Sequence, residues 1–449
     1  MARTGETVAT RPTLATLPAA VSRVHLDPDE LRTFASSSPA KLIALGLLLI
    51  GLCLGAGSVT SNTVSERQAA LEVLLADTEP DSHSAHKLYT SLSIADAAAS
   101  TAFISGGVEP ETVRDRYAQA VGEAAAEVVI HSGTAGHDRP ENSVDTRLRT
   151  GIATGLPVYT GLVETARTNN RFGNPVGAAY LSEASNQMQT TLLPMAEELQ
   201  DLRSDAVDVA QRNHVRPPWF AIGLIIVALA ALVWAQVEVA ARWRRTLNAG
   251  LLVASAAMSI LLAWTVIAGS VSAAAMIEGR DHGAVPASRL TESRILTQQA
   301  RSAETLKLVR RDATGDYDRI FDTGVARLTE LLDGYPGDAP AAAAVTDARA
   351  ALDRWRAAHQ RMNEALARGD YQGASVVATG AGGADAAAQV EALDRALDEG
   401  LDRTRETLRG RIATATDSLT LLGPGATALA FLAVAAIGVG LWPRLREYR

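Results

Sequence analysis

The stretch LIALGLLLIGLCLGAGSV, residues 42–59, decides the fold. It carries no charge, and a helix of roughly 20 apolar residues spans the ~30 Å hydrocarbon core of a bilayer. Three further apolar runs follow at 219–239, 251–276 and 421–442. We therefore predict an all-α membrane protein with four transmembrane helices.

Composition excludes several classes of protein. A chain of 449 residues would accommodate about three soluble domains, but its apolar residues are concentrated in these runs. The single cysteine, Cys53, excludes an intramolecular disulfide framework and a zinc site built on cysteines. No large block of Lys and Arg is present, which excludes a DNA-binding protein of the basic kind. No charge lies at the middle of a run, so a transporter is disfavoured.

Charge orients the chain in the cell membrane. Residues 60–217 hold 21 acids against 12 Lys and Arg, a net of −9, and residues 277–420 hold 23 against 19, a net of −4. The short turn that contains Arg242, Arg244 and Arg245 is instead basic. Because short cytoplasmic segments collect Lys and Arg, we expect both termini and this turn inside the cell and the two acidic segments outside it. The predicted division is a cytoplasmic segment 1–40, membrane helix 41–59, extracytoplasmic bundle 60–217, membrane helix 218–240, cytoplasmic turn 241–248, membrane helix 249–276, extracytoplasmic bundle 277–420, membrane helix 421–442 and cytoplasmic tail 443–449.

The two extracytoplasmic segments resemble each other in sequence. At an offset of 196 residues, Tyr159 aligns with Trp355 and Gly173 with Gly369, so that the aromatic residue precedes the glycine by 14 residues in both halves. Chance similarity between Ala-rich helices is the alternative interpretation. Shared helix breakers at shared spacing favour an internal duplication.

Both extracytoplasmic segments are predicted to be helical bundles. Apolar residues recur at intervals of three and four, which is typical of helices that pack on one another, and nothing alternates with a period of two. Turn signals divide each segment into four helices and so predict two up-and-down four-helix bundles. These turns lie at 106–110, 131–140 and 171–175 in the first segment, and at 314–316, 334–340 and 369–370 in the second.

Helix breakers also stand where each bundle returns to the membrane. They are Pro217 and Pro218 before the second apolar run and Pro424 at the start of the fourth. A proline at this place marks either a hinge or an ordinary helix start, since the first turn of a helix leaves its N–H groups without partners. A rigid continuous rod is disfavoured there.

The search for catalytic or ligand-binding chemistry is largely negative. The chain has no His-Glu-x-x-His motif, phosphate-binding glycine loop or Gly-x-Ser-x-Gly elbow, so we predict a non-enzymatic protein without cofactor or metal. His83 and His86 lie one helical turn apart beside Asp81, but solvated histidines are favoured over a metal site. Arginine pairs offer carboxylate clamps, although pairing with neighbouring acids is the favoured interpretation. These pairs are Arg114 with Arg116, Arg147 with Arg149, and Arg310 with Arg311.

A small-residue step occurs in the first apolar run. Gly51 and Gly55 are spaced as Gly-x-x-x-Gly. Such residues let helices approach closely, either within one chain or between two copies in a homodimer. Packing within the chain is the commoner use.

This combination of features resembles a known family. Four membrane helices, two helical outside segments, little cytoplasmic chain and only three lysines, at Lys41, Lys87 and Lys307, are similar to actinobacterial membrane proteins of the GlnX type. The bundle around Trp355 and its turn at 367–371 are also similar to the four-helix sensor domains of bacterial chemoreceptors. The GlnX resemblance implies a relay from a GlnH-like solute-binding lipoprotein, which recognises aspartate and glutamate, to a PknG-like cytoplasmic Ser/Thr kinase.

We therefore predict a non-enzymatic transmembrane signal relay. The cytoplasmic segments cannot form an output domain, since stable domains rarely fall below ~40 residues, so a separate protein would carry the signal onward. A direct sensor with a ligand between bundle helices and a structural or efflux-accessory scaffold are the alternatives. The predicted partner contacts are the membrane-distal turn residues Gly106, Gly107, Glu109, Pro110, Arg171, Asn174, Pro175, Thr314, Asp316, Tyr317, Gly369, Asp370 and Tyr371. The predicted cytoplasmic contacts are Arg242, Arg244 and Arg245.

Overall fold

The computed structural model describes residues 38–104, 109–130, 140–214, 218–243, 248–311, 314–380 and 382–446, and it contains no strand in those ranges. The all-α prediction is therefore confirmed. Its elements are α2 (Ser38–Val73), η1 (Leu74–Thr78), α3 (Glu79–Ile104), α4 (Glu111–Ile130), α5 (Pro140–Arg171), α6 (Val176–Gln187), η2 (Met188–Leu192), α7 (Leu193–His214), α8 (Trp219–Trp243), α9 (Ala249–Gly279), η3 (Arg280–Ala284), α10 (Val285–Arg310), α11 (Asp316–Asp333), α12 (Ala342–Ala367), α13 (Tyr371–Thr379), α14 (Ala386–Asp417) and α15 (Leu422–Arg446).

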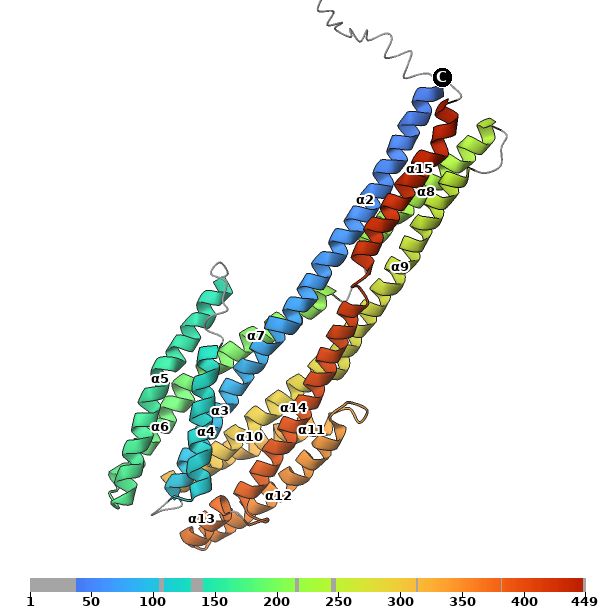
Figure 1. Cartoon of the computed structure of the whole chain (residues 1–449). Coiled ribbons are helices and arrows are strands. Elements are labelled where there is room, and N and C mark those ends of the chain that lie inside the picture. Colours follow the sequence, from blue (N-terminus) through green and yellow to red (C-terminus); the bar gives the residue numbers. More distant parts are fainter. Residues whose placement is uncertain are drawn as a thin grey trace, which may run out of the picture.

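Four helices are long and apolar enough to cross a membrane, as predicted. Figure 1 shows α2, α8, α9 and α15 side by side at one end of an elongated molecule, with the other helices at the opposite end. Their shared core includes Leu49, Ile225, Leu261 and Ile437. Large apolar side chains also point outward, among them Leu47 at 64% exposure, which is the pattern of a surface that faces lipid. The chain is a multi-pass membrane protein.

Glycines set how closely the membrane helices approach. A Cβ atom added to Gly57 would lie 2.3 Å from the Cβ of Ala430, and one added to Gly250 would lie 2.3 Å from the carbonyl oxygen of Ala436. Only glycine fits at these two contacts with α15. Gly51 and Gly55 meet nothing within 4 Å, so the predicted step does not pack against another described helix of this chain.

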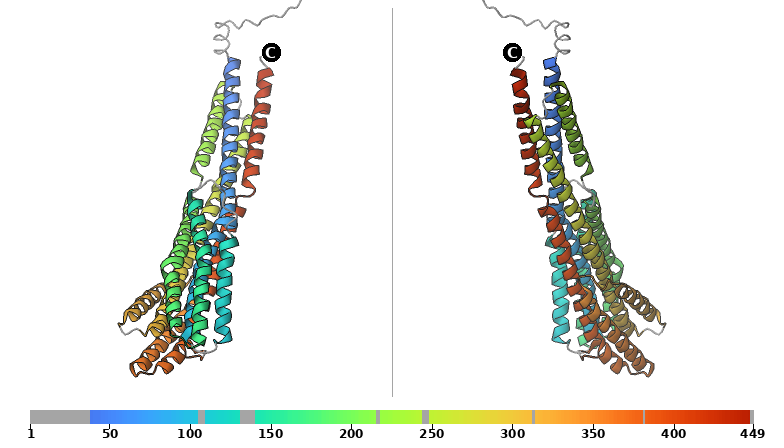
Figure 2. Two further views of the ribbon diagram at one scale, coloured as in Figure 1. Left: turned by 90° about the vertical axis from the view of Figure 1, so that its left-hand side faces the viewer. Right: turned by 90° about the vertical axis from the view of Figure 1, so that its right-hand side faces the viewer.

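Two helices run without a break from the membrane end into the bundles. The first passes through α2, η1 and α3 over Leu42–Ile104, and the second passes through α9, η3 and α10 over Ala249–Arg310. In each, one π-helical turn lies at the level where the bundle begins, and the amides of Glu79 and Val285 donate across it to residues five positions earlier. Figure 2 shows these rods from both sides.

Proline accounts for the π-helical turns. Pro80, Pro194 and Pro286 are each the second residue of the α-helix that follows a π turn. A proline inside a helix has no N–H to donate and its ring collides with the carbonyl one turn earlier. The extra residue of a π turn relieves that collision while the rod continues, and such bulges are frequent at functional sites.

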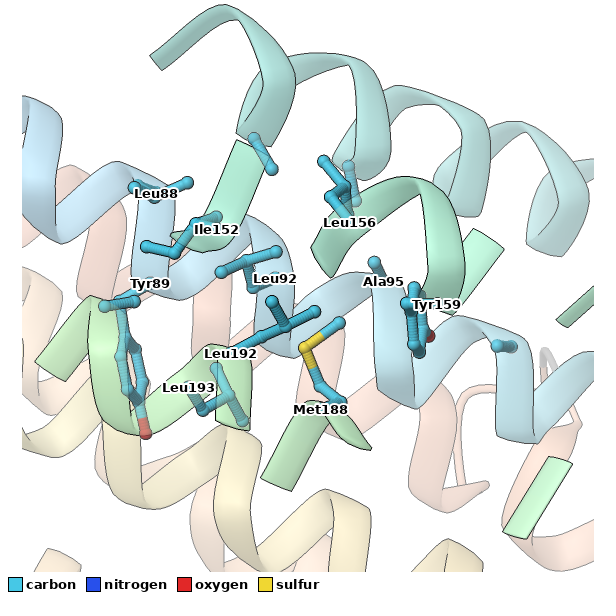
Figure 3. Packing of buried hydrophobic residues seen from close by; sticks show 14 of the residues in the cluster. Leu88, Tyr89, Leu92, Ala95, Ile152, Leu156, Tyr159, Met188, Leu192 and Leu193 are labelled. Atoms are coloured by element: carbon cyan, nitrogen blue, oxygen red, sulfur yellow. The ribbon is translucent and has the colours of Figure 1, made fainter. Parts of the chain in front are cut away.

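The first bundle has its own core, built by α3, α4, α5, α6 and α7. Figure 3 shows Leu92 of α3, Ile152 and Leu156 of α5, and Leu192 beside α7 converging in its interior. Tyr159 is fully buried in the same cluster. Each buried leucine or isoleucine contributes ~1.5–3 kcal/mol, so this core stabilises the bundle strongly.

The second bundle repeats the arrangement with α10, α11, α12 and α14. Trp355 of α12, like Tyr159 of α5, is fully buried in the core of its bundle, and Phe321 packs edge-on against it at 5.2 Å between ring centroids. Gly173 and Gly369 both adopt the left-handed conformation, at φ +70° and +75°. Aligned residues therefore hold equivalent positions in the two halves, as a duplication requires.

The fourth helix of the second bundle departs from the expectation of one continuous element. The short helix α13 ends at Thr379, and α14 starts only at Ala386. Gly380, Gly382 and Gly383 lie between them, and glycine carries the largest entropic cost of ordering in a helix. The break follows from these glycines.

The return of the second bundle to the membrane is different from its entry through α9, η3 and α10. Residues 418–421 form a turn between α14 and α15, and Pro424 lies in the first turn of α15, where its missing N–H costs nothing. Pro218 directly precedes α8. Pro217 lies outside the described residues.

Candidate functional site

The membrane-distal turns of the two bundles meet in one face. Ser375 of α13 donates to the carbonyl oxygen of Ile104 at the end of α3, at 3.5 Å. Arg310, at the end of α10, donates to Ser182 of α6 at 2.8 Å. Figure 1 shows α13 and the end of α5 far from the membrane helices. We call this surface the distal face, made by the ends of α3, α5, α10 and α12 and the starts of α4, α6, α11 and α13.

The structure brings most of the predicted partner contacts to the distal face. The predicted contact residues that are uncharged and exposed there are Pro110, Asn174, Pro175, Thr314 and Gly369. Arg171 is exposed beside them. Gly106 and Gly107 lie outside the described residues, as do Arg244 and Arg245 of the predicted cytoplasmic contact, while for Arg242 only the backbone of α8 is described.

Several charged members of the predicted set are engaged within the chain. Glu109 is buried, and its carboxylate lies 3.0 Å from Nε of Arg167. Asp316 pairs with Arg319, and Asp370 caps α13 by accepting from the amide of Gly373 at 2.8 Å. These carboxylates hold the turns in shape, and that leaves the uncharged members as the better contact surface.

The two predicted aromatic members stand beside arginines. Tyr371 lies under the guanidinium of Arg311 at 5.0 Å from the ring centre, and Tyr317 lies 5.9 Å from that of Arg310. A cation over an aromatic face contributes ~0.5–1 kcal/mol at an exposed site. Arg310 and Arg311 therefore order the second bundle's part of the distal face and do not form a carboxylate clamp with each other.

Sequence reasoning missed an apolar stripe on the distal face. Phe172, Val176 and Tyr180 are spaced by four residues and are 78%, 48% and 38% exposed. Val176 and Tyr180 share one side of α6, Phe172 lies in the turn that precedes this helix, and the buried Gly177 and Leu181 lie on the adjoining side of α6. The signal in the sequence was three large apolar residues in and directly after the predicted turn at 171–175. Exposed aromatic stripes of this kind mark surfaces that bind other proteins.

The other predicted arginine pairs follow the neighbour-pairing interpretation. Arg149 is buried with its Nε 3.1 Å from Asp145, and Arg147 lies 3.7 Å from Glu198. Arg114 approaches Asp115 at 3.9 Å. Arg116 lines the hollow between the bundles and lies 3.9 Å from Glu391 of α14.

The two bundles are joined through α3 and α10. Gln299 of α10 donates to the hydroxyl of Tyr89 on α3 at 3.3 Å. Gln189 of η2 donates to Asp96 of α3 at 3.0 Å and to Ser302 of α10 at 3.3 Å. The two rods that enter from the membrane are therefore the same helices that carry the contact between bundles.

Asp96 is the charged group at the centre of this contact. It is 1% exposed and also accepts from Ser185 at 3.1 Å. Burial raises its pKa to about 6, against the lowering effect of these hydrogen bonds. A carboxylate ionised at neutral pH thus sits between the bundles without a basic partner in the described contacts.

The second bundle encloses a buried polar network. Glu304 of α10 receives Trp355 Nε1 at 3.2 Å and Arg301 at 2.6 Å, and lies 2.9 Å from Nδ1 of His359. Although burial favours its neutral form, the His359 hydrogen bond and the Arg301 charge lower the pKa of Glu304 below its usual value. The network is closed by its own partners, which makes it a structural core and not an open ligand site.

His83 and His86 are not the solvated pair that the sequence favoured. Both lie within α3, and His86 is buried at 6% exposure between the bundles. Burial lowers the pKa of both, that of His86 to about 3, so His86 is neutral at physiological pH. The described residues contain no group of three or more metal-ligating side chains, so a metal site gains no support.

Comparison with known proteins supports a role in sensing. Residues 70–212, about a third of the chain, match the model of the actinobacterial sensor domain family. No curated protein and no solved structure matches the chain. The matched segment spans the whole first bundle, from the end of α2 to α7. The first bundle is thus similar to an actinobacterial sensor domain, which supports an actinobacterial membrane sensor protein with a function in signal transduction.

Proposed function

We propose that this protein is a non-enzymatic transmembrane signal relay. Its bundles face the outside of the cell, a solute-loaded binding lipoprotein docks on the distal face, and the membrane helices carry the change to a cytoplasmic Ser/Thr kinase. The observation that carries the proposal is the pair of uninterrupted rods, Leu42–Ile104 and Ala249–Arg310, that join distal face to membrane.

The packing of the rods supports a relay. Because α10 is hydrogen-bonded to α3 and to η2 of the first bundle, a partner that shifts one bundle against the other displaces both rods. Small shifts of packed helices by ~1–2 Å are a common form of signal transfer. The π turns η1 and η3 lie on these rods where the bundles begin, so they are the natural points of bending.

The charge distribution supports the orientation. The bundle segments are acidic and the turn around Arg242 is basic, which is the asymmetry of an outside bundle and an inside turn. A GlnH-like lipoprotein and a PknG-like kinase are the partners that the family resemblance implies. The exposed stripe of Phe172, Val176 and Tyr180 is the surface we assign to the lipoprotein.

A binding experiment with the full chain in nanodiscs tests the proposal. A purified GlnH-like lipoprotein is titrated with and without glutamate, and we expect binding only in the loaded state. Phe172→Glu should weaken it roughly 30-fold, since a central aromatic contact contributes ~2 kcal/mol. Val158→Glu is the matched control, because Val158 is 55% exposed on α5 away from the distal face. No binding, or equal binding without glutamate, would overturn the proposal.

A further inference from the structure

A cleft lies between the two bundles at the level of the π turns. It holds about 530 Å³ and is lined by α3 and α7 of the first bundle and by α10 and α14 of the second. Glu79, which follows η1, and Ala284, the last residue of η3, are at its membrane side. Volumes of this size accommodate small organic molecules.

The cleft carries an excess of carboxylates. Glu197, Asp201 and Asp208 project from α7, and none of the three forms an ion pair within the described ranges. Partial burial and the neighbouring Asp205 raise the pKa of Asp201, as expected where no cation compensates. The one arginine in the lining, Arg405, is already held by Glu79.

Two buried polar side chains in the lining lack partners. Neither ring nitrogen of His86 nor Oε1 of Gln200 has a partner at full hydrogen-bond distance in the described structure, and the only side-chain acceptor near His86 is Gln200 itself, close enough to raise the pKa of His86 against the effect of burial. His86 and Gln200 are 6% and 7% exposed. An unpaired buried polar atom destabilises a fold by ~1–3 kcal/mol, so such atoms at a cavity wall indicate a missing partner. A neutral imidazole and an amide oxygen both offer acceptors to an N–H donor.

The lining also contains apolar side chains. They are Val207 of α7, Ile295 and Leu296 of α10, and Leu401 and Leu408 of α14, and they stand among polar residues of the same helices. These side chains suit a hydrocarbon chain. The adjoining hollow, which His86 also lines, is different because it contains Arg294, and Arg294 is paired with Asp394 and Asp398.

We propose that this cleft binds a small organic cation, a primary ammonium group on a short apolar chain. The ammonium group donates to His86 and Gln200 and is attracted by Glu197 and Asp201, while the chain lies on Leu296 and Leu408. The ligand bridges α7 to α10 and α14 and so stabilises the docked arrangement of the bundles beside the π turns. It is an input separate from the lipoprotein at the distal face.

Calorimetric titration of the full chain in nanodiscs of zwitterionic lipid tests this site. The probe is n-pentylamine, with n-pentanol and pentanoate as uncharged and anionic counterparts. We expect saturable binding of the amine at least tenfold tighter than of either counterpart, since an ionic hydrogen bond contributes ~1.5–3 kcal/mol. The double variant Glu197→Gln and Asp201→Asn should weaken amine binding roughly tenfold or more.

Glu198→Gln is the matched control, because Glu198 is the next residue of α7 and pairs with Arg147 on α5 outside the cleft. It should bind the amine like the unaltered chain. Unchanged thermal unfolding of the double variant checks that it is folded. Absent saturation, equal binding of the three probes, or an unaffected double variant would overturn the proposal. No lipoprotein is present, so this result is independent of the relay test.

Discussion

Asp96→Asn gives the most quantitative prediction about how the bundles are joined. The carboxyl has a pKa of about 6 in the fold against the ordinary value of 3.8. Because the folded pKa is raised, protonation favours the folded state, and stability from this group is lost as pH rises from about 4 to about 6. The difference of about two units corresponds to ~3 kcal/mol at neutral pH.

Asparagine removes the ionised carboxylate but keeps an oxygen that accepts from Ser185 and Gln189. At pH 7.5 we expect Asp96→Asn to unfold at a higher temperature, by roughly 6–12 °C for ~3 kcal/mol in a domain of this size. At pH 4 the two proteins should unfold together. The unfolding temperature of the variant should therefore change less between pH 4 and pH 7.5 than that of the unaltered chain.

Thermal unfolding of the full chain in nanodiscs, followed by circular dichroism at both pH values, measures this effect. Asp205→Asn is the control, since Asp205 is exposed on α7 and its substitution should leave the unfolding temperature unchanged at both pH values. Destabilisation by Asp96→Asn at pH 7.5, or a difference independent of pH, would refute the burial of Asp96 between α3, η2 and α10.

Three further predictions concern packing. Trp355→Ala should lower the free energy of unfolding of the second bundle by ~3–5 kcal/mol in urea, because a fully buried indole is lost and Glu304 loses a hydrogen-bond donor. Trp355→Phe should lower this free energy by less. His86→Leu should raise the unfolding temperature by a few degrees, since ~1–3 kcal/mol of unpaired polar burial is removed, and a lower temperature would argue that its nitrogens are partnered. Gly57→Leu should disrupt the packing of the membrane helices and cause aggregation on gel filtration, whereas Gly51→Leu should be tolerated. Equal behaviour of the two variants would contradict the packing of α2 on α15.

Much of the fold could be predicted because its signals are local. Uncharged runs of membrane length and the spacing of apolar residues define the helices, and Gly or Pro clusters define most turns. Gly173 and Gly369 marked equivalent left-handed turns in both halves. The prolines Pro80 and Pro286 also carry a local signal, for a π turn inside a continuous rod, which apolar periodicity alone does not reveal.

The contact between bundles could not be predicted from apolar periodicity. The buried part of α3 is rich in alanine and serine, as in Ala95–Ser100, so no single face stands out. Small residues allow close approach on every side of a helix, and which side meets α10 is decided only by the assembled fold. The burial of His83 and His86, and the cleft beside them, depend on that same contact.

The displacement of the membrane helices on partner binding tests the central claim most directly. Spin labels at Leu47 of α2 and Leu252 of α9, both exposed, are introduced in a Cys53→Ala background, which removes the single native cysteine. Pulsed electron paramagnetic resonance then measures the distance between the labels in nanodiscs. The relay predicts a shift of ~1–2 Å when the glutamate-loaded lipoprotein is added, and none with the unloaded form. An unchanged distance at saturating loaded lipoprotein would contradict it.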